Sequence, residues 1–158
     1  MTTPPPMEVL TDLQINAEMQ RMILDAYVPN DRPIVLGYVG LDGKPHLSWR
    51  GSVVPLTETS LGIWARNPEG GLGQSLSANP NVNLLYREPN GPSGFSRATM
   101  NFAGRAHIAE DEAERRQVYD AMPQRERDAD KDYKGIAVVV DLDTITGAYP
   151  GYRLQMRR

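Results

Sequence analysis

Apolar and polar residues along the chain predict one helix followed by a series of short strands. Between Glu8 and Tyr27 the apolar residues recur at a helical spacing, and a proline-containing cluster from Pro29 to Pro33 follows. We therefore predict a helix over Glu8–Tyr27 that ends before this cluster. The proline-rich residues 1–7 predict a flexible N-terminal arm.

A β-hairpin is predicted next. The β-rich run Pro33–Leu41 is followed by Asp42-Gly43, a pair typical of hairpin turns, and by a returning strand over Lys44–Pro55. Apolar and polar residues alternate in the returning strand, which predicts a half-buried strand with one polar face. One face carries Leu47, Trp49, Gly51 and Val53, and the polar face carries His46, Ser48, Arg50 and Ser52.

The rest of the chain continues this pattern and adds two helices. The further predicted strands are Leu61–Arg66, Val82–Arg87, the alternating run Phe95–Ile108 and the fully buried, β-branched run Gly135–Asp143. The predicted helices are a short one that starts at Asn67-Pro68 and ends before Asn79-Pro80, and a charged one over Asp111–Met122. The segment Pro123–Lys134 is so polar that we expect it on the surface.

These elements predict a single domain over residues 1–158, because neither a repeat nor a change of composition divides the chain. Its class is mainly β (α+β), with about six antiparallel strands and short flanking helices. Closure of the sheet into a barrel would remove its exposed edges. The 14 glycines and 13 prolines fall between short apolar runs and agree with a turn-rich β protein.

Composition excludes several classes of function. The chain has no cysteine, which excludes a disulfide framework, a thiol nucleophile and a cysteine metal site. A net charge of −3 argues against a general nucleic-acid binder, whose surface is basic. No apolar run approaches the ~20 residues that cross a bilayer, and the N-terminus lacks a signal-peptide pattern. We therefore expect a cytoplasmic protein without nucleic-acid or membrane partners.

No residue pattern predicts acid–base, nucleophilic or metal catalysis. The two histidines, His46 and His107, lie on separate predicted strands without ligand spacing, so we predict no metal site. The carboxylates between Glu110 and Glu114 open a helix, where the helix dipole favours negative charge. No serine has the surroundings of a nucleophile elbow.

An anionic ligand is the best-supported candidate. The glycine-rich run Gly70–Gly73 precedes a helix, where free backbone N–H groups favour a phosphate. Arg50 lies on the polar face of its strand, and Arg66 ends the following strand just before the glycines. If those strands pair as a hairpin, both guanidinium groups lie near the same helix end and match phosphate oxygens. A tight turn and two surface ion pairs are the alternative interpretation.

At these residues the sequence resembles the pyridoxamine 5'-phosphate oxidase-like family of FMN- and deazaflavin-binding split β-barrels. The order of elements from about Arg32 to Arg153 is similar, and so are the run Leu76–Val82 and the closing run Ile145–Gly151. The resemblance implies a split barrel and a homodimer with each cofactor in a groove between subunits. It also implies hydride transfer to or from a small-molecule substrate, carried by the cofactor.

The resemblance and the polar strand face together give a set of candidate cofactor-binding residues. They are Ser48, Arg50, Ser52, Trp64, Ala65, Arg66, Asn67, Gly70, Gly71, Gln74 and Ser75. Within this set the arginines would hold the phosphate, and Ser48 and Ser52 would meet the ribityl chain or the ring edge. Trp64 would line the ring pocket or lie in the core. Tyr149, Tyr152 and Arg153 would close the pocket of the partner subunit or simply dock the tail.

One residue departs from the family pattern. Many members have a lysine at the position of Leu72, where it meets the phosphate. The missing cation favours an alternative function, a non-catalytic protein that stores or senses a flavin or another planar ligand. The leading prediction remains a flavin- or deazaflavin-dependent oxidoreductase. FMN comes ahead of a deazaflavin because it is the family's commoner ligand.

Overall fold

A computed structural model describes residue 3 and residues 6–158 of the chain. Residues 1, 2, 4 and 5 of the predicted arm lie outside the described residues, whereas Thr3, Pro6 and Met7 are exposed and belong to no helix or strand. The strands are β1 (Glu8–Asp12), β2 (Ile34–Val39), β3 (Pro45–Arg50), β4 (Val54–Thr57), β5 (Ser60–Ala65), β6 (Asn81–Glu88), β7 (Ala98–Ile108), β8 (Ile136–Tyr149) and β9 (Tyr152–Arg157). The α-helices are α1 (Ala17–Asp25), α2 (Leu72–Ala78), α3 (Glu112–Ala121) and α4 (Gln124–Asp128).

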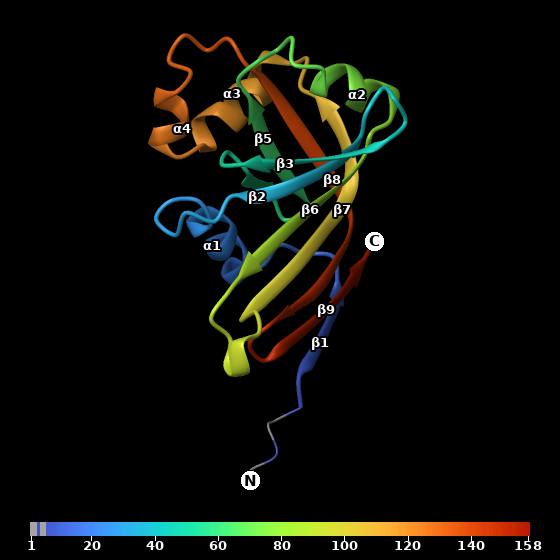
Figure 1. Ribbon diagram of the computed structural model, residues 1–158, viewed down its shortest axis with the longest axis vertical. Helices are drawn as coiled ribbons and strands as arrows, with labels where there is room; N and C mark the ends of the chain where they lie inside the picture. Colours follow the sequence, from blue (N-terminus) through green and yellow to red (C-terminus); the bar gives the residue numbers. More distant parts are fainter. Residues whose placement is uncertain (1–2, 4–5) are drawn as a thin grey trace.

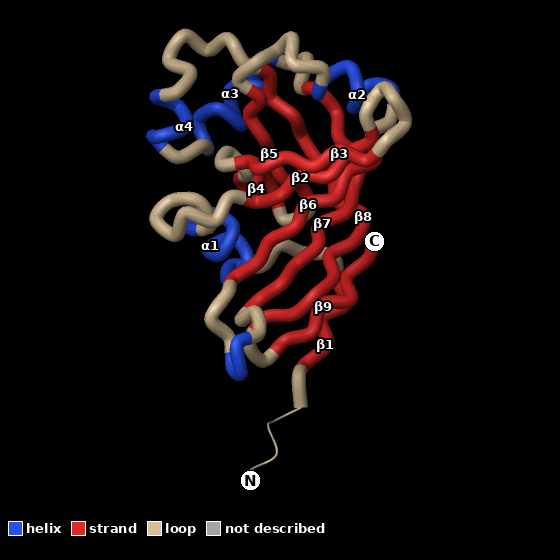
Figure 2. Tube along the Cα trace, viewed as in Figure 1, coloured by secondary structure: helices blue, strands red, loops and turns tan. Residues whose placement is uncertain are grey.

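The strands form one sheet that divides at its longest strand, β8. Its path runs β1-β9-β8-β7-β6-β2-β3, and β5 pairs with the first half of β8 while β9 pairs with the second half. All of these pairs are antiparallel except β1 with β9. Helices α2, α3 and α4 lie at one end of the molecule and β1 and β9 at the other (Figures 1 and 2). The predicted class, a mainly β split barrel with short flanking helices, is confirmed.

The described chain has nine strands rather than the six predicted. The predicted strand Lys44–Pro55 is two strands, because Gly51–Val53 leaves the ladder between β3 and β4. The predicted tail after Asp143 is instead the second half of β8 and a hairpin to β9. The long alternating strand begins at Ala98 rather than Phe95, and its buried face includes Met100 and Phe102 as expected.

The first helix is shorter than predicted, because residues Glu8–Asp12 form the edge strand β1. This strand pairs in parallel with β9, so its conformation is decided by a partner almost at the other end of the chain. The helical spacing of apolar residues is real only from Ala17 onward, where Met19, Met22 and Ile23 are buried.

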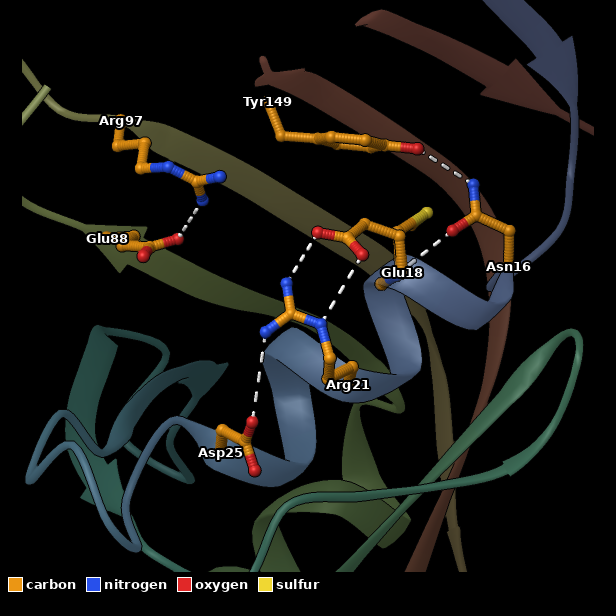
Figure 3. Close-up of polar contacts among 8 residues, drawn as sticks. Asn16, Glu18, Arg21, Asp25, Glu88, Arg97 and Tyr149 are labelled. Carbon is orange, nitrogen blue, oxygen red and sulfur yellow. Dashed lines mark hydrogen bonds and ion pairs between the residues drawn. The ribbon is translucent and has the colours of Figure 1, made fainter. Parts of the chain in front are cut away.

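Asn16 fixes the start of α1. Its side-chain oxygen accepts a hydrogen bond from the backbone N–H of Met19 (3.0 Å), which is the usual N-cap arrangement. Its side-chain nitrogen donates to the hydroxyl of Tyr149 (2.9 Å) at the end of β8 (Figure 3). Further along the helix, Arg21 hydrogen-bonds Glu18, while Arg97, just before β7, pairs with Glu88 at the end of β6. Asn16 therefore both caps the helix and ties it to the sheet.

Replacing Asn16 with alanine is expected to lower the free energy of unfolding by about 1–2 kcal/mol, because both the cap and the bond to Tyr149 are lost. Asn16→Ser keeps an acceptor for the cap but is too short to keep the bond to Tyr149, so its stability should lie between those of Asn16→Ala and the parent protein. Urea denaturation of the three proteins measures this order. Equal midpoints for Asn16→Ala and the parent would contradict the assigned role.

Apart from the main core, a second hydrophobic cluster lies between β5, β8 and α3. It shows that one segment predicted to be surface contributes to the interior. Trp64 of β5 packs with Tyr119 and other residues of α3, and its indole N–H donates to the carboxylate of Asp130 (2.9 Å). Asp130 is buried and also accepts from the backbone N–H of Gly135 (2.8 Å). The segment Pro123–Lys134 is therefore not simply surface: it contains α4 and supplies a buried acceptor that satisfies Trp64.

The loop before α2 also differs from its prediction. Asn67-Pro68 does not start the helix, because α2 begins at Leu72 and Gly71 occupies its N-cap position with φ of 83°. Asn67 instead accepts a hydrogen bond from the backbone N–H of Glu69 (3.0 Å) within the loop. The predicted end of the helix, before Asn79-Pro80, is correct.

Candidate functional site

Arg50 and Arg66 line the same small cavity, of about 200 Å³, at the end of β3 and β5. The route to this arrangement differs from the expected hairpin, since β3 pairs with β2 while β5 pairs with β4 and β8. Ser52 joins the two segments instead. Its hydroxyl donates to the carbonyl of Trp64 (3.0 Å) and accepts from the backbone N–H of the same residue (3.1 Å).

The two guanidinium groups are available to a ligand. Among the described residues, no carboxylate oxygen lies within 4.0 Å of Arg50 or Arg66 in an ion pair. Arg50 donates from Nε to the hydroxyl of Ser48 (3.1 Å), which leaves its other nitrogens free for an acceptor. Burial lowers the pKa of the Arg50 guanidinium, but arginine stays charged at neutral pH. A half-buried cation without a counter-ion favours an anionic ligand.

Other side chains complete the wall of this arginine cavity. One of them is acidic: Glu126 of α4 lies against Gly51, where an added Cβ would be 2.9 Å from a carboxylate oxygen. The residues that line the cavity are Tyr27, Pro33, Trp49, Arg50, Gly51, Ser52, Trp64, Arg66 and Glu126.

Of the sequence-predicted site residues, the structure brings four to the cavity: Arg50, Ser52, Trp64 and Arg66. Ser52 is 2% exposed and its hydroxyl is occupied by backbone bonds, while Trp64 is 3% exposed and belongs to the second hydrophobic cluster. Ser48 touches the cavity only through its bond to Arg50.

The remaining predicted residues do not line the arginine cavity. Ala65 is buried and paired with Ile136. The others lie in the loop before α2 or on the helix itself, where Gln74 is exposed and Ser75 is buried. The residues in this group are Ala65, Asn67, Gly70, Gly71, Gln74 and Ser75. Leu72, the departure from the family pattern, is buried in the main core.

A larger groove of about 640 Å³ adjoins the arginine cavity and shares Tyr27, Pro33 and Trp49 with it. Its floor is apolar because Trp49, Val35 and Leu85 stand in register across β3, β2 and β6. The other lining residues are Asp31, Arg32 and Arg87. A cationic cavity that continues into an apolar groove fits a ligand with an anionic tail and a flat hydrophobic ring.

The apolar face of β3 is the exposed one, although burial of the apolar face is the usual outcome for a half-buried strand. Trp49 is 72% exposed and Leu47 76% exposed, whereas Ser48 and Arg50 stand opposite the buried Leu36 and Ile34 of β2. Alternation along one strand predicts two faces but not which of them faces the core. Trp49 is absent from the predicted site residues for this reason, although a tryptophan on such a strand is a usable signal. Leu85 is absent because its position beside Val35 follows from the pairing of β6 with β2.

The tail tyrosines lie outside the arginine cavity of their own chain, and their role at a partner's pocket stays a prediction. Tyr149 is buried and bonded to Asn16, and its ring lies 5.1 Å from that of Tyr152 across the β8–β9 turn. Both line a separate cavity of about 580 Å³ with Glu18 and Arg97. Neither tyrosine reaches the arginine cavity of the same chain.

Compared by sequence, the chain matches no protein-family model and none of the curated proteins. Comparison of folds gives clear matches at low identity. An FMN-binding protein from Syntrophomonas wolfei matches with a TM-score of 0.60 and 6% identity over 85% of this chain and 88% of the other. A pyridoxinephosphate oxidase-family protein related to general stress protein 26, from Clostridium acetobutylicum, matches with a TM-score of 0.57 and 12% identity. The match covers 78% of this chain and 84% of the other.

HupZ from Group A Streptococcus is a third similar structure, with a TM-score of 0.63 and 15% identity over 88% of this chain and 98% of the other. The chain therefore has the pyridoxamine 5'-phosphate oxidase-like fold. Identities this low carry no more than the fold. Among the described residues, no helix has the length and apolar character needed to span a membrane.

Proposed function

We propose that this protein binds a flavin-type cofactor, FMN or a deazaflavin, and uses it as an oxidoreductase on a small molecule. One observation carries the proposal: two arginines that have no ion-pair partner among the described residues share a cavity that continues into a groove with an apolar floor. The fold supports it, because FMN-binding and pyridoxinephosphate oxidase-family proteins have similar structures.

In this proposal each part of the site has one task. Arg50 and Arg66 hold the anionic tail of the cofactor through charge-assisted hydrogen bonds. Trp49, Val35 and Leu85 give the ring an apolar surface beside them. The cofactor, when bound, supplies the hydride chemistry, so the protein needs no acid–base pair or nucleophile of its own.

We further propose that two copies of the chain form a homodimer through the exposed face of β3, β2 and β6. Leu47 and Trp49 are 76% and 72% exposed, and Leu85 on β6 is 40% exposed. An apolar surface of this kind on a soluble domain is typical of an interaction site. The groove opens on the same face, so a partner there would cover the bound ring.

Trp49→Asp is expected to convert the dimer to a monomer, with at least a 30-fold weaker association, because a central tryptophan carries ≥2 kcal/mol in typical interfaces. Phe95→Asp is the matched control, since Phe95 is 75% exposed but lies in a loop outside this face. Sedimentation velocity over a concentration series measures both. A monomeric parent protein, or a Trp49→Asp dimer as tight as the parent, would remove this face from the proposal.

Absorbance spectra test the cofactor part of the proposal. Purified protein, or protein incubated with micromolar FMN or deazaflavin, should show bound-cofactor absorbance that a nicotinamide donor bleaches. Absence of binding for both cofactors would overturn the oxidoreductase proposal.

A second candidate, a non-catalytic flavin-binding protein, is favoured by Leu72. This residue is buried in the main core, at the position where many members of the resembled family carry a phosphate-binding lysine. The same spectra separate the two candidates. A bound flavin that no nicotinamide donor reduces, while free FMN is reduced under identical conditions by an added reductase, would support storage or sensing.

A further inference from the structure

Among the described residues, Glu126 is the only acidic one that lines the arginine cavity. The other charged lining residues are Arg50 and Arg66, and the remaining ones are neutral. The cavity therefore carries a formal charge of +1 rather than the +2 of the two arginines alone. No ion pair within 4.0 Å joins Glu126 to either arginine in the described part of the chain, so its charge remains to act on a ligand.

Local packing holds Glu126 at the cavity wall. Its helix, α4, is seated by the neighbouring Arg125, whose guanidinium lies 4.6 Å from the centre of the Tyr27 ring. Gly51 leaves the room that Glu126 and Tyr27 occupy, because an added Cβ would come within 2.6 Å of the tyrosine ring and 2.9 Å of the carboxylate. The backbone N–H of Glu126 donates to the carbonyl of Pro123 (3.0 Å).

A fixed carboxylate repels a bound anion in proportion to the charge of that anion. A phosphomonoester carries close to two negative charges at pH 7.5, since its second pKa is about 6, whereas a phosphodiester carries one. Glu126 therefore reduces the binding free energy of a phosphomonoester about twice as much as that of a phosphodiester. The two arginines attract a phosphomonoester more strongly than a phosphodiester by the same argument, so Glu126 reduces the advantage of the doubly charged phosphate in this cavity.

We propose that Glu126 is a specificity-determining residue that shifts the preference of the arginine cavity from a doubly charged phosphomonoester toward a singly charged phosphodiester. This inference rests on the proposed function, because it concerns the tail of the same cofactor.

Two flavins with the same ring test this inference: FMN, a phosphomonoester, and riboflavin 4',5'-cyclic phosphate, a phosphodiester. Their dissociation constants are measured at pH 7.5 by flavin fluorescence for the parent protein and Glu126→Gln. Loss of the carboxylate should lower the dissociation constant of FMN about tenfold and that of the cyclic phosphate about threefold. The ratio of the two constants should therefore shift about threefold in favour of FMN. Glu126→Ala should shift it in the same direction.

Asp128→Asn is the matched control, because Asp128 is on the same helix, bonds Gln124 (2.7 Å) and does not line the cavity. It should leave the preference unchanged. If both flavins bind and neither Glu126 variant shifts the preference, or if Asp128→Asn shifts it equally, the role of Glu126 is wrong while the proposed function stands. If neither flavin binds the parent protein and the deazaflavin also fails, the proposed function itself fails.

Discussion

Simultaneous replacement of Arg50 and Arg66 by alanine is expected to weaken FMN binding by at least 100-fold. Each hydrogen bond to a charged group contributes about 1.5–3 kcal/mol, so Arg50→Ala alone should cost about that amount and the double variant more. Neither guanidinium has a counter-ion in the described structure, so their removal leaves no carboxylate unpaired. The folded state should therefore survive the change.

Equilibrium titration followed by flavin fluorescence measures this effect, with thermal unfolding of each variant as a check on folding. Arg105→Ala is the control, because Arg105 pairs with Asp143 on the exposed face of β7 and lies outside the cavity. Affinity that is unchanged in the double variant would place the flavin phosphate elsewhere.

Gly147→Ala is expected to lower the free energy of unfolding by about 3–5 kcal/mol. Gly147 lies on β8 between β7 and β9, with φ of 129°, a conformation that residues with a side chain rarely adopt. An added Cβ would come within 2.0 Å of the backbone carbonyl oxygen of Thr99, which cannot move without breaking the ladder. Backbone strain and overpacking each cost about 1–3 kcal/mol, and here they add.

The hairpin glycine provides a matched comparison. Gly43 also has positive φ, 75°, but an added Cβ there meets no atom of the described residues within 4 Å. Gly43→Ala should therefore cost only the backbone term, about 1–2 kcal/mol. Urea denaturation gives both values, and an equal loss in the two variants would show that the close approach at Thr99 does not matter.

Elements whose shape depends on nearby residues were predictable from the sequence. The alternation of β7 places Met100 and Phe102 in the core as expected, and Asp42-Gly43 forms the turn between β2 and β3. The β1 strand was not predictable, because its conformation depends on pairing with β9 near the other end of the chain. A short segment with a few apolar residues fits a helix equally well until that partner is known.

The sequence predicts which charged residues form much of the site, but it does not predict how the site is shaped. The convergence of Arg50 and Arg66 was predicted from a hairpin between their strands, but that hairpin does not form, and Ser52 brings the two segments together instead. The exposure of Trp49 depends on which face of β3 meets the core, a choice that the register with β2 makes. Glu126 comes from a segment whose polarity indicated only surface.

Native mass spectrometry of the purified protein tests the central claim most directly, because one spectrum shows both the number of chains and any bound small molecule. We predict a species of two chains with two flavin-type cofactors, and loss of the cofactors in the Arg50→Ala, Arg66→Ala double variant. A parent protein that carries no flavin or deazaflavin, even after incubation with micromolar amounts of each, would contradict the account.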